Sequence, residues 1–167
     1  LALSAQGAAA EVSYKGKTVT LFITSGTGGS VDLLSRLGAR HLADHLPGNP
    51  TVVAKNKGGA GGSVGANYIY DQAPKDGTEL GSSLNSIPFA PLFYGQKKSR
   101  ASFDPNKFNW IASPVKFVAV SIAWHTSPVK KWQDLRTHEM IVGSSGRGSS
   151  GTIDGQILNA LMGFKYK

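Results

Sequence analysis

The sequence predicts an α/β fold in which helices cover both faces of a parallel sheet. Short segments rich in β-branched and aromatic residues alternate with longer segments of helical period, which gives the order β, α, β, α, β, α in the first part of the chain. Glycine-rich loops connect strands to the helices that follow them, as in open α/β sheets. With 167 residues, 40% of them hydrophobic, the chain is long enough to bury the core of such a fold.

The elements of the first part follow from periodicity and breaker residues. In the first helix, Val31, Leu34 and Leu42 fall on one side of a helical wheel of roughly 100° per residue. Proline and glycine then end each unit because they cannot continue the pattern. The expected elements are strands over residues 18–23, 51–54 and 78–84, and helices over residues 31–46, 63–72 and 87–94.

The pattern changes in the second part of the chain. Residues 95–107 are polar and form a candidate linker. Beyond them we expect apolar, β-rich runs over residues 108–113 and 116–124, a short capped helix near residues 127–135, a strand over residues 139–144, a helix that ends near residue 162, and the opening of another strand at residues 164–167.

The charge balance favours an acidic ligand or partner. The chain carries 18 Lys and Arg against 10 Asp and Glu, a net charge of +8. These residues do not gather on a stripe interleaved with stacking aromatics, so we expect no nucleic-acid partner. The chain has no cysteine, which excludes disulfides, zinc thiolate sites and thiol nucleophiles.

The first ten residues resemble the end of a secretory signal. They are apolar or small and finish in a small-x-small cleavage pattern before Glu11. No other segment approaches the apolar length of a transmembrane helix. We therefore expect a soluble, exported protein whose mature form begins near Glu11.

Two loops of glycine and hydroxyl residues, over residues 24–30 and 143–152, are candidate anion sites. Glycine lets the backbone approach a ligand closely, and the first amides of the following helix are donors at the positive end of its dipole. Ligands of open α/β sheets bind beyond the carboxyl ends of strands. If two such sheets faced each other, the two loops would line the cleft between them.

Phosphate and nucleotide motifs fit less well. Gly16-Lys17-Thr18 has the last residues of a P-loop, but Glu11 stands where the first glycine belongs and the strand follows the motif. Residues 146–151 match G-x-G-x-x-G, although the acidic residue expected about 20 positions on would lie beyond the chain end. A nucleotide- or phosphate-binding enzyme that uses this loop is the alternative function.

Catalytic and metal sites are weakly indicated. Arg147 breaks a G-x-S-x-G elbow, and no histidine can be assigned as the base of a serine nucleophile, so the loop hydroxyls are interpreted as neutral donors to an anion. His41 and His45 are four apart on a helix but have no third ligand, and we expect packed or half-buried imidazoles. We predict no enzyme activity, no cofactor and no metal.

Four spaced motifs together resemble the Bug or TctC family, the periplasmic solute-binding proteins of tripartite tricarboxylate transporters. The resemblance covers nearly everything after Glu11. The motifs are Ser25-Gly-Thr-Gly-Gly-Ser-Val-Asp32, Lys55-Asn-Lys-Gly-Gly-Ala-Gly-Gly-Ser-Val-Gly-Ala-Asn67, Ala73-Pro-Lys-Asp-Gly-Thr78 and Gly143-Ser-Ser-Gly-Arg-Gly-Ser-Ser150.

The resemblance implies a periplasmic-binding-protein-like fold of two α/β domains that are joined by crossing strands and clamp the ligand in a cleft. Family members are about twice as long. On this basis residues 1–10 are a signal-peptide remnant, residues 11–107 the first domain without its C-terminal return, and residues 108–167 the start of a second, truncated domain. The frequent proline of the first family loop is replaced by Ser25-Gly26, and Gly58 also stands at a common proline position.

The resemblance further implies a small carboxylate ligand, membrane permease subunits as partners, a monomer, and a periplasmic location. The ligand would be held by backbone amides and hydroxyls in place of its water shell. Transferred by position, the ligand-binding residues are Ser25, Gly26, Thr27, Gly28, Gly29, Ser30, Asp32, Ser83, Asn85, Ser144, Ser145, Gly146, Ser149, Ser150 and Thr152.

Overall fold

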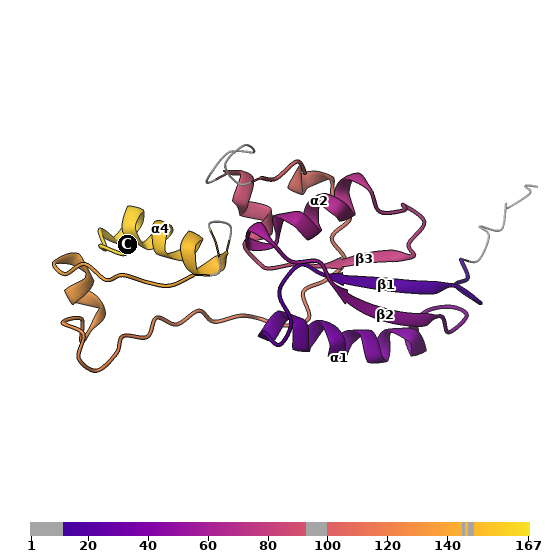
Figure 1. The fold of residues 1–167 in the computed structure, drawn as a ribbon, viewed down its shortest axis with the longest axis horizontal. Helices are drawn as coiled ribbons and strands as arrows, with labels where there is room; N and C mark the ends of the chain where they lie inside the picture. Colours follow the sequence, from indigo (N-terminus) through magenta and orange to yellow (C-terminus); the bar gives the residue numbers. More distant parts are fainter. Residues whose placement is uncertain (1–11, 93–99, 145, 147–148) are drawn as a thin grey trace, which may run out of the picture.

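The protein contains a three-stranded parallel sheet with strand order β2-β1-β3 (Figure 1). The computed structural model describes residues 12–92, 100–144, 146 and 149–167. The strands are β1 (Thr18–Ile23), β2 (Thr51–Asn56) and β3 (Glu79–Ser82). The first begins where the sequence places it, the second runs two residues further, and the third is shorter at both ends than predicted. All three run in the same direction, so their carboxyl ends lie at one edge of the sheet.

Two helices connect these strands. Helix α1 (Ser30–His45) links β1 to β2, and α2 (Ser63–Asp71), which follows a 3-10 turn at Ala60–Gly62, links β2 to β3. Figure 1 shows α1 and α2 on opposite sides of the strands. The predicted order of alternating strands and helices, and the parallel sheet, are therefore confirmed.

Strand β1 lies at the centre of the sheet and is buried on both faces. Val19 and Ile23 have no exposed surface, and the ring of Phe22 packs edge-on against that of Tyr68 at 4.8 Å between centroids. A strand that is covered on both sides needs apolar residues on both faces, which explains the nearly continuous apolar run of its sequence.

Helix α1 turns a face of small and polar residues toward the sheet. Asp32, Ser35 and Ala39 are its buried residues. Val31, Leu34 and Leu42 are half-buried beside them, as the helical wheel predicted. His41 and His45, in contrast, are exposed. The expectation of packed or half-buried imidazoles is wrong, because the buried stripe passes through residues 32, 35 and 39 and the two histidines lie off it.

The chain that follows β3 packs against α2. A 3-10 turn at Ile87–Phe89 continues as helix through residue 92, and the remainder of the predicted 87–94 helix lies outside the described residues. Beyond this gap Phe103, with no exposed surface, joins Ala66, Ile87 and Ala101 in one cluster. The segment after residue 100 thus folds back onto the first α/β unit.

Residues 108–124 are extended but form no strand. In Figure 1 this segment runs between the α/β unit and the C-terminal part of the chain. Phe108 packs against the core cluster, but the apolar side chains further along are open to solvent, with Val118, Val120 and Ile122 between 77% and 82% exposed. The sequence correctly indicates apolar, β-rich composition here, but a strand also needs a neighbour that forms a backbone hydrogen-bond ladder with it, and no described segment forms one with residues 108–124.

The C-terminal part consists of a 3-10 helix at Trp132–Arg136 and helix α4 (Ser150–Met162). Helix α4 ends at residue 162, as predicted, and Gly163 follows it in the left-handed conformation, with φ of 67°. The predicted strands at 139–144 and 164–167 meet only through one parallel bridge, Met140 to Tyr166. In this bridge Met140 and Val142 donate to the carbonyls of Lys165 and Lys167, and the amide of Lys167 donates to the carbonyl of Met140.

A small apolar cluster holds this part together. It contains Val129, Leu135 and Phe164, with Met140, Leu158 and Tyr166 packed against it. None of the helices in the described ranges is both long and apolar enough to cross a membrane.

Candidate functional site at the carboxyl ends of the strands

Two glycine-rich loops meet where β1 and β2 end. The amide of Lys57 donates to the carbonyl of Ile23 at 2.8 Å, and the amide of Thr24 donates to that of Ser82 at 2.9 Å. The loops touch, because a Cβ added at Gly58 would lie 3.2 Å from the carbonyl carbon of Ser25. The residues after all three strands therefore gather at one edge of the sheet, the position at which ligands of such sheets bind.

Asp32 holds the first loop in place. This carboxylate, 3% exposed, accepts a hydrogen bond from the Gly28 amide at 2.9 Å. Asn56 bridges the carboxylate and the loop, because its side-chain amide donates to Asp32 Oδ1 at 2.8 Å and to the Ser25 carbonyl at 3.1 Å. Gly28 has φ of 83°, which a residue with a side chain adopts at a cost, so glycine suits the turn that brings its amide to Asp32.

Arg36 completes the network around this carboxylate. Its Nε lies 3.0 Å from Asp32 Oδ1, and its terminal nitrogen donates to Asn56 Oδ1 at 2.5 Å. The hydrogen bond from Gly28, together with those from Asn56 and Arg36, lowers the pKa of Asp32 to about 2. The negative charge of Asp32 is thus fixed in the first turn of α1 and paired with a cation of the same helix.

The depressed pKa of Asp32 predicts a loss of stability in acid. A carboxyl whose pKa falls on folding, here from an ordinary value of about 3.9, stabilises the folded state fully above that pH and ceases to do so as the pH drops toward the folded value of about 2. We expect the unfolding midpoint in urea to fall between pH 4 and pH 2, roughly the interval between these two values, and to fall less in Asp32→Asn.

The pKa values of Asp76 and Asp134 are also lowered, mainly by hydrogen bonds from Thr78 and from the Lys130 amide, and these two carboxyls contribute to the same acid transition. The contribution of Asp32 is obtained by comparing how the urea midpoint depends on pH in the unchanged protein and in Asp32→Asn. Equal pH dependence of the two proteins would contradict the assigned network.

The second loop, residues 57–62, leads into α2. Gly59, Ala60, Gly61 and Gly62 all have positive φ, between 48° and 118°. Helix α2 then begins at Ser63, and its first turn carries no acidic residue. This glycine run is one of the four motifs of the sequence, but none of its residues is among the predicted ligand contacts; the signal for it is a cluster of four glycines directly before a helix.

The C-terminal loop reaches this edge of the sheet from the other part of the chain. Ser150 Oγ donates to Asn85 Oδ1 at 2.5 Å, which joins the start of α4 to the residues after β3. A Cβ added at Gly146 would lie 3.5 Å from the amide nitrogen of Gly61. The structure thus brings Asn85, Ser150 and Gly146 of the predicted site together with the second loop.

Hydroxyl groups within the C-terminal loop are bonded to one another. Ser149 Oγ donates to the Gly146 carbonyl at 2.7 Å, and Thr152 Oγ1 donates to Ser144 Oγ at 2.6 Å. These bonds link Ser144, Gly146 and Ser149 to the start of α4 through neutral groups. Ser145 of the predicted site lies outside the described residues, as do Arg147 and Gly148 of the G-x-G-x-x-G pattern. In the described ranges no group of three His, Cys, Asp or Glu side chains could hold a metal ion.

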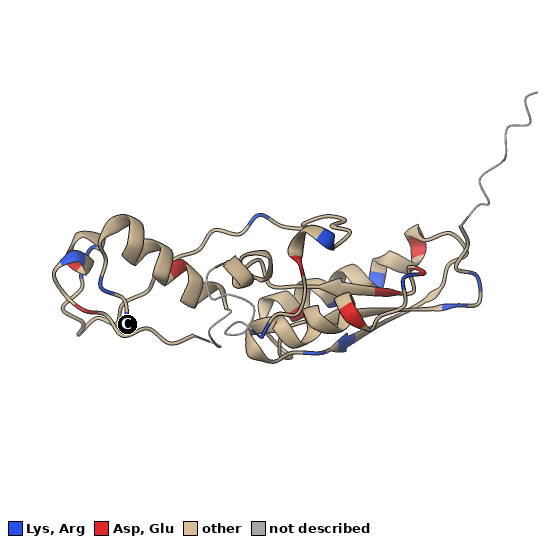
Figure 2. Cartoon of the chain, turned by 90° about the horizontal axis from the view of Figure 1, so that it is seen from above, with Lys and Arg blue, Asp and Glu red and all other residues tan. Residues whose placement is uncertain are grey.

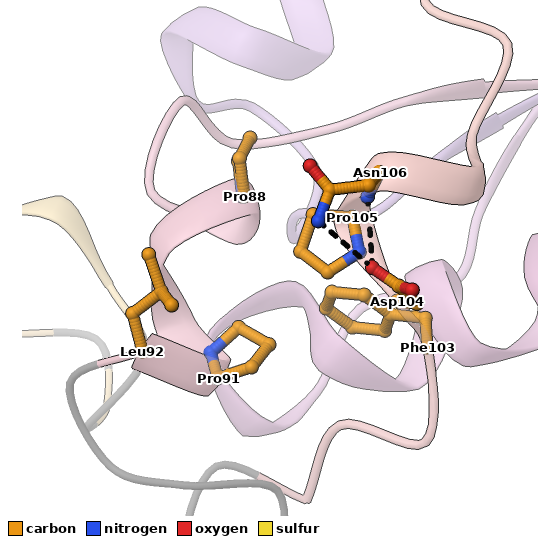
Figure 3. Close-up of a pocket in the computed structure, with 7 residues that line it drawn as sticks. All are labelled: Pro88, Pro91, Leu92, Phe103, Asp104, Pro105 and Asn106. Carbon is orange, nitrogen blue, oxygen red and sulfur yellow. Dashed lines mark hydrogen bonds between the residues drawn. The ribbon is translucent and has the colours of Figure 1, made fainter.

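Two cavities flank the segment after β3. One, of about 360 Å³, is lined by Ser83 and Asn85 of the predicted site and by Trp110 and Ile111 of the extended segment. The other, of about 270 Å³, lies between the prolines of residues 88–91 and Phe103 to Asn106 (Figure 3), and no predicted site residue lines it. Figure 3 also shows the Asn106 side chain and amide bonded to Asp104, so these polar groups are turned to each other rather than to a ligand.

Charged side chains are scattered over both parts of the chain. Figure 2 shows Lys and Arg at separate points along the α/β unit and the C-terminal part rather than on one stripe. Lys57 lies over the ring of Tyr68, at 3.8 Å from its centroid. The positive charge of the chain therefore contributes a diffuse field and no compact basic patch among the described residues.

Comparison with known proteins gives two relatives by sequence. No family model matches the chain. A UPF0065 protein of Bordetella bronchiseptica is 26% identical over 168 residues, which cover 98% of this chain and 48% of the relative. Protein BugT of Bordetella pertussis is 37% identical over 91 residues, which cover 53% of this chain and 27% of BugT. The chain is thus Bug-like in the sense that it is similar in sequence to BugT and to a UPF0065 protein.

The fold of this Bug-like protein is also found in a solved structure. A protein described as a periplasmic transporter matches with a TM-score of 0.63 over 92% of this chain and 52% of that one, at 21% identity. The mixed α/β, periplasmic-binding-protein-like fold is thereby confirmed. The Bug-like chain spans about half the length, or less, of the proteins that it matches.

Proposed function

We propose that this Bug-like protein is a solute-binding receptor of a membrane transporter, that it works in the periplasm, and that its solute is a small carboxylate. The observation that carries the proposal is the meeting of two glycine-rich strand-helix loops with the C-terminal loop at the carboxyl edge of one parallel sheet. The relatives support the receptor function, since one is BugT and a solved structure of the same fold is described as a periplasmic transporter.

The polar groups at the carboxyl edge of the sheet suit an anion that is small and strongly hydrated. Loop amides, helix N-termini and hydroxyls such as that of Ser83 are neutral donors that replace water around a carboxylate. Ligand contacts are proposed for the predicted residues of the first loop, of the β3 end and of the C-terminal loop. Asp32 contributes by holding the first loop, because its oxygens already accept three hydrogen bonds.

The same arrangement supports closure of the two parts of the chain around the solute. The α/β unit and the C-terminal part touch near the site through Ser150 and Asn85 and through Gly146 and Gly61. A solute that bonds to loops of both parts stabilises the arrangement in which they are close, and the closed surface is what a permease recognises. The serines act here as donors, and we assign no catalytic role to them.

Calorimetric titration of the full-length protein tests the proposal. Citrate, succinate, L-glutamate and benzoate sample tricarboxylate, dicarboxylate, amino-acid and aromatic solutes, and ATP samples the nucleotide alternative. We expect saturable heat with at least one acid and none with ATP. Binding of ATP without binding of any of the four acids would contradict the receptor function and favour the enzyme that uses the 146–151 loop.

A further inference from the structure

The cavity of about 360 Å³ beside the end of β3 adjoins the proposed solute site. Ser83 and Asn85, two of the predicted ligand-binding residues, line it together with Trp110 and Ile111 of the extended segment. Ser83 directly follows the last residue of β3, and Asn85 is bonded to Ser150 at the start of α4. A solute bound where the strands end therefore has this cavity as its neighbour.

The lining of this cavity is uncharged. Its other described residues are Leu84, Pro88, Ala112 and Ser113, so none of the described side chains that line it is acidic or basic. An ionised group that enters such a space loses water without gaining a counter-charge, which is costly, whereas an apolar group gains from burial. The cavity is therefore suited to the uncharged body of a solute and not to a second carboxylate.

Trp110 offers an aromatic surface at this cavity. The residue is 56% exposed, and its indole N–H donates to the Pro105 carbonyl at 2.9 Å. Because the one polar atom of the ring is already bonded within the protein, the exposed remainder of the side chain is apolar. Such a surface packs favourably against another aromatic ring.

A row of aromatic rings holds Trp110 in position. The ring of Phe108 lies 5.3 Å from that of Trp110, and the same ring lies 5.5 Å from Phe103, which has no exposed surface. Tyr70 of α2 packs edge-on against Phe108 at 5.6 Å. The row thus begins in the core and ends at the cavity. A side chain that is oriented by its neighbours before the solute arrives loses little conformational freedom on binding.

We propose that this cavity binds an aromatic ring of the solute, with Trp110 packed against that ring, and that the receptor therefore selects aromatic monocarboxylates over dicarboxylates and tricarboxylates. The ring lies between residues 83–85 and 110–112, and its carboxylate is directed toward the ends of the strands. Trp110 is on this basis a specificity-determining residue. The assignment rests on the proposed receptor function and adds to it the class of solute.

Calorimetric titration of the full-length protein with benzoate, succinate, L-glutamate and citrate tests this selection. Benzoate is expected to bind at least about tenfold more tightly than the other three acids, because each of these brings a further charged group that the cavity cannot pair. Trp110→Ala should raise the dissociation constant for benzoate at least about tenfold, and Trp110→Phe, which keeps an aromatic ring, should raise it less than about threefold.

Tryptophan fluorescence supplies a second readout. Benzoate should change the emission of the unchanged protein, because its ring packs on the indole of Trp110. In Trp110→Phe this change should be lost, although the variant still binds benzoate in the calorimeter. The second variant decides the matter if Trp110→Ala does not fold.

Trp132→Ala is the matched control. Trp132 is 51% exposed, much like Trp110, but it lies in the C-terminal 3-10 helix, beside Phe164 and Arg136, and lines neither of the two cavities described above. Its replacement should leave the dissociation constant for benzoate within about twofold of the unchanged value.

The solute class and the receptor function can fail separately. If the unchanged protein binds succinate, L-glutamate or citrate at least as tightly as benzoate, the solute class is overturned and the receptor function stands. Unweakened binding of benzoate by Trp110→Ala, or an emission change that persists in Trp110→Phe, overturns the role of Trp110 in the same way. If the unchanged protein binds none of the four acids, the receptor function fails and the aromatic subsite fails with it.

Discussion

Replacement of Phe103 with alanine is expected to lower the free energy of unfolding by about 3–5 kcal/mol. The side chain has no exposed surface, and it packs with Ala66 of α2 and Ile87 of the turn after β3. Its ring also lies 5.5 Å from that of Phe108. Truncation leaves a cavity between segments that are distant in sequence, so little of the lost volume can be recovered by local collapse. Urea unfolding followed by circular dichroism measures the change.

Phe89→Ala is the control for this substitution. Phe89 lies in the same turn as Ile87 but is 51% exposed. Surface truncation of this kind is expected to cost less than about 1 kcal/mol. If Phe103→Ala costs no more than Phe89→Ala, the segment after residue 100 does not pack against α2 in solution, and the described course of the chain is wrong there.

The second large loss of stability is expected when Asn56 is replaced. Its side chain makes three hydrogen bonds, to Asp32, to the Ser25 carbonyl and from Arg36. Asn56→Ala removes all three and leaves part-buried partners without bonds, which should lower the free energy of unfolding by about 2–4 kcal/mol. The first loop should also loosen, and exchange of the Gly28 amide with solvent, followed by nuclear magnetic resonance, should become faster.

Asn106→Ala provides the comparison for Asn56. The Asn106 side chain bonds only to Asp104 within its own turn, at 3.2 Å, in an exposed position. Its removal is expected to change stability by less than about 0.5 kcal/mol. A loss at Asn56 as small as that at Asn106, with unchanged exchange at Gly28, would show that the Asp32 network does not hold the first loop.

The sequence was sufficient to predict elements whose own periodicity decides their structure. Strand β1 and helix α1 have clear patterns and short, unambiguous breakers, and they form close to the expected positions. Residues 108–124 show the limit of this reasoning. Val118, Val120 and Ile122 favour extended backbone, but whether a strand forms depends on a neighbouring segment, which local sequence does not supply.

The sequence predicts which loops form the candidate site, but it does not predict the contacts between their side chains. The glycine runs before α1 and in the C-terminal part were found from their composition alone. The role of Asn56 was missed, because its partner Asp32 is 24 residues earlier and the pair meets only when β2 lies beside β1. Ser150 and Asn85 are 65 positions apart, and their bond likewise depends on how the two parts are arranged.

The central claim, that a solute carboxylate binds where the parallel strands end, is tested most directly by a crystal structure of the full-length protein with a bound acid. We expect carboxylate oxygens within hydrogen-bonding distance of the loops that follow β1 and β2, with Gly146 and Ser150 of the C-terminal part beside the solute. An acid bound instead in the cavity between Pro88 and Asn106 (Figure 3), with the strand ends occupied only by solvent, would contradict it.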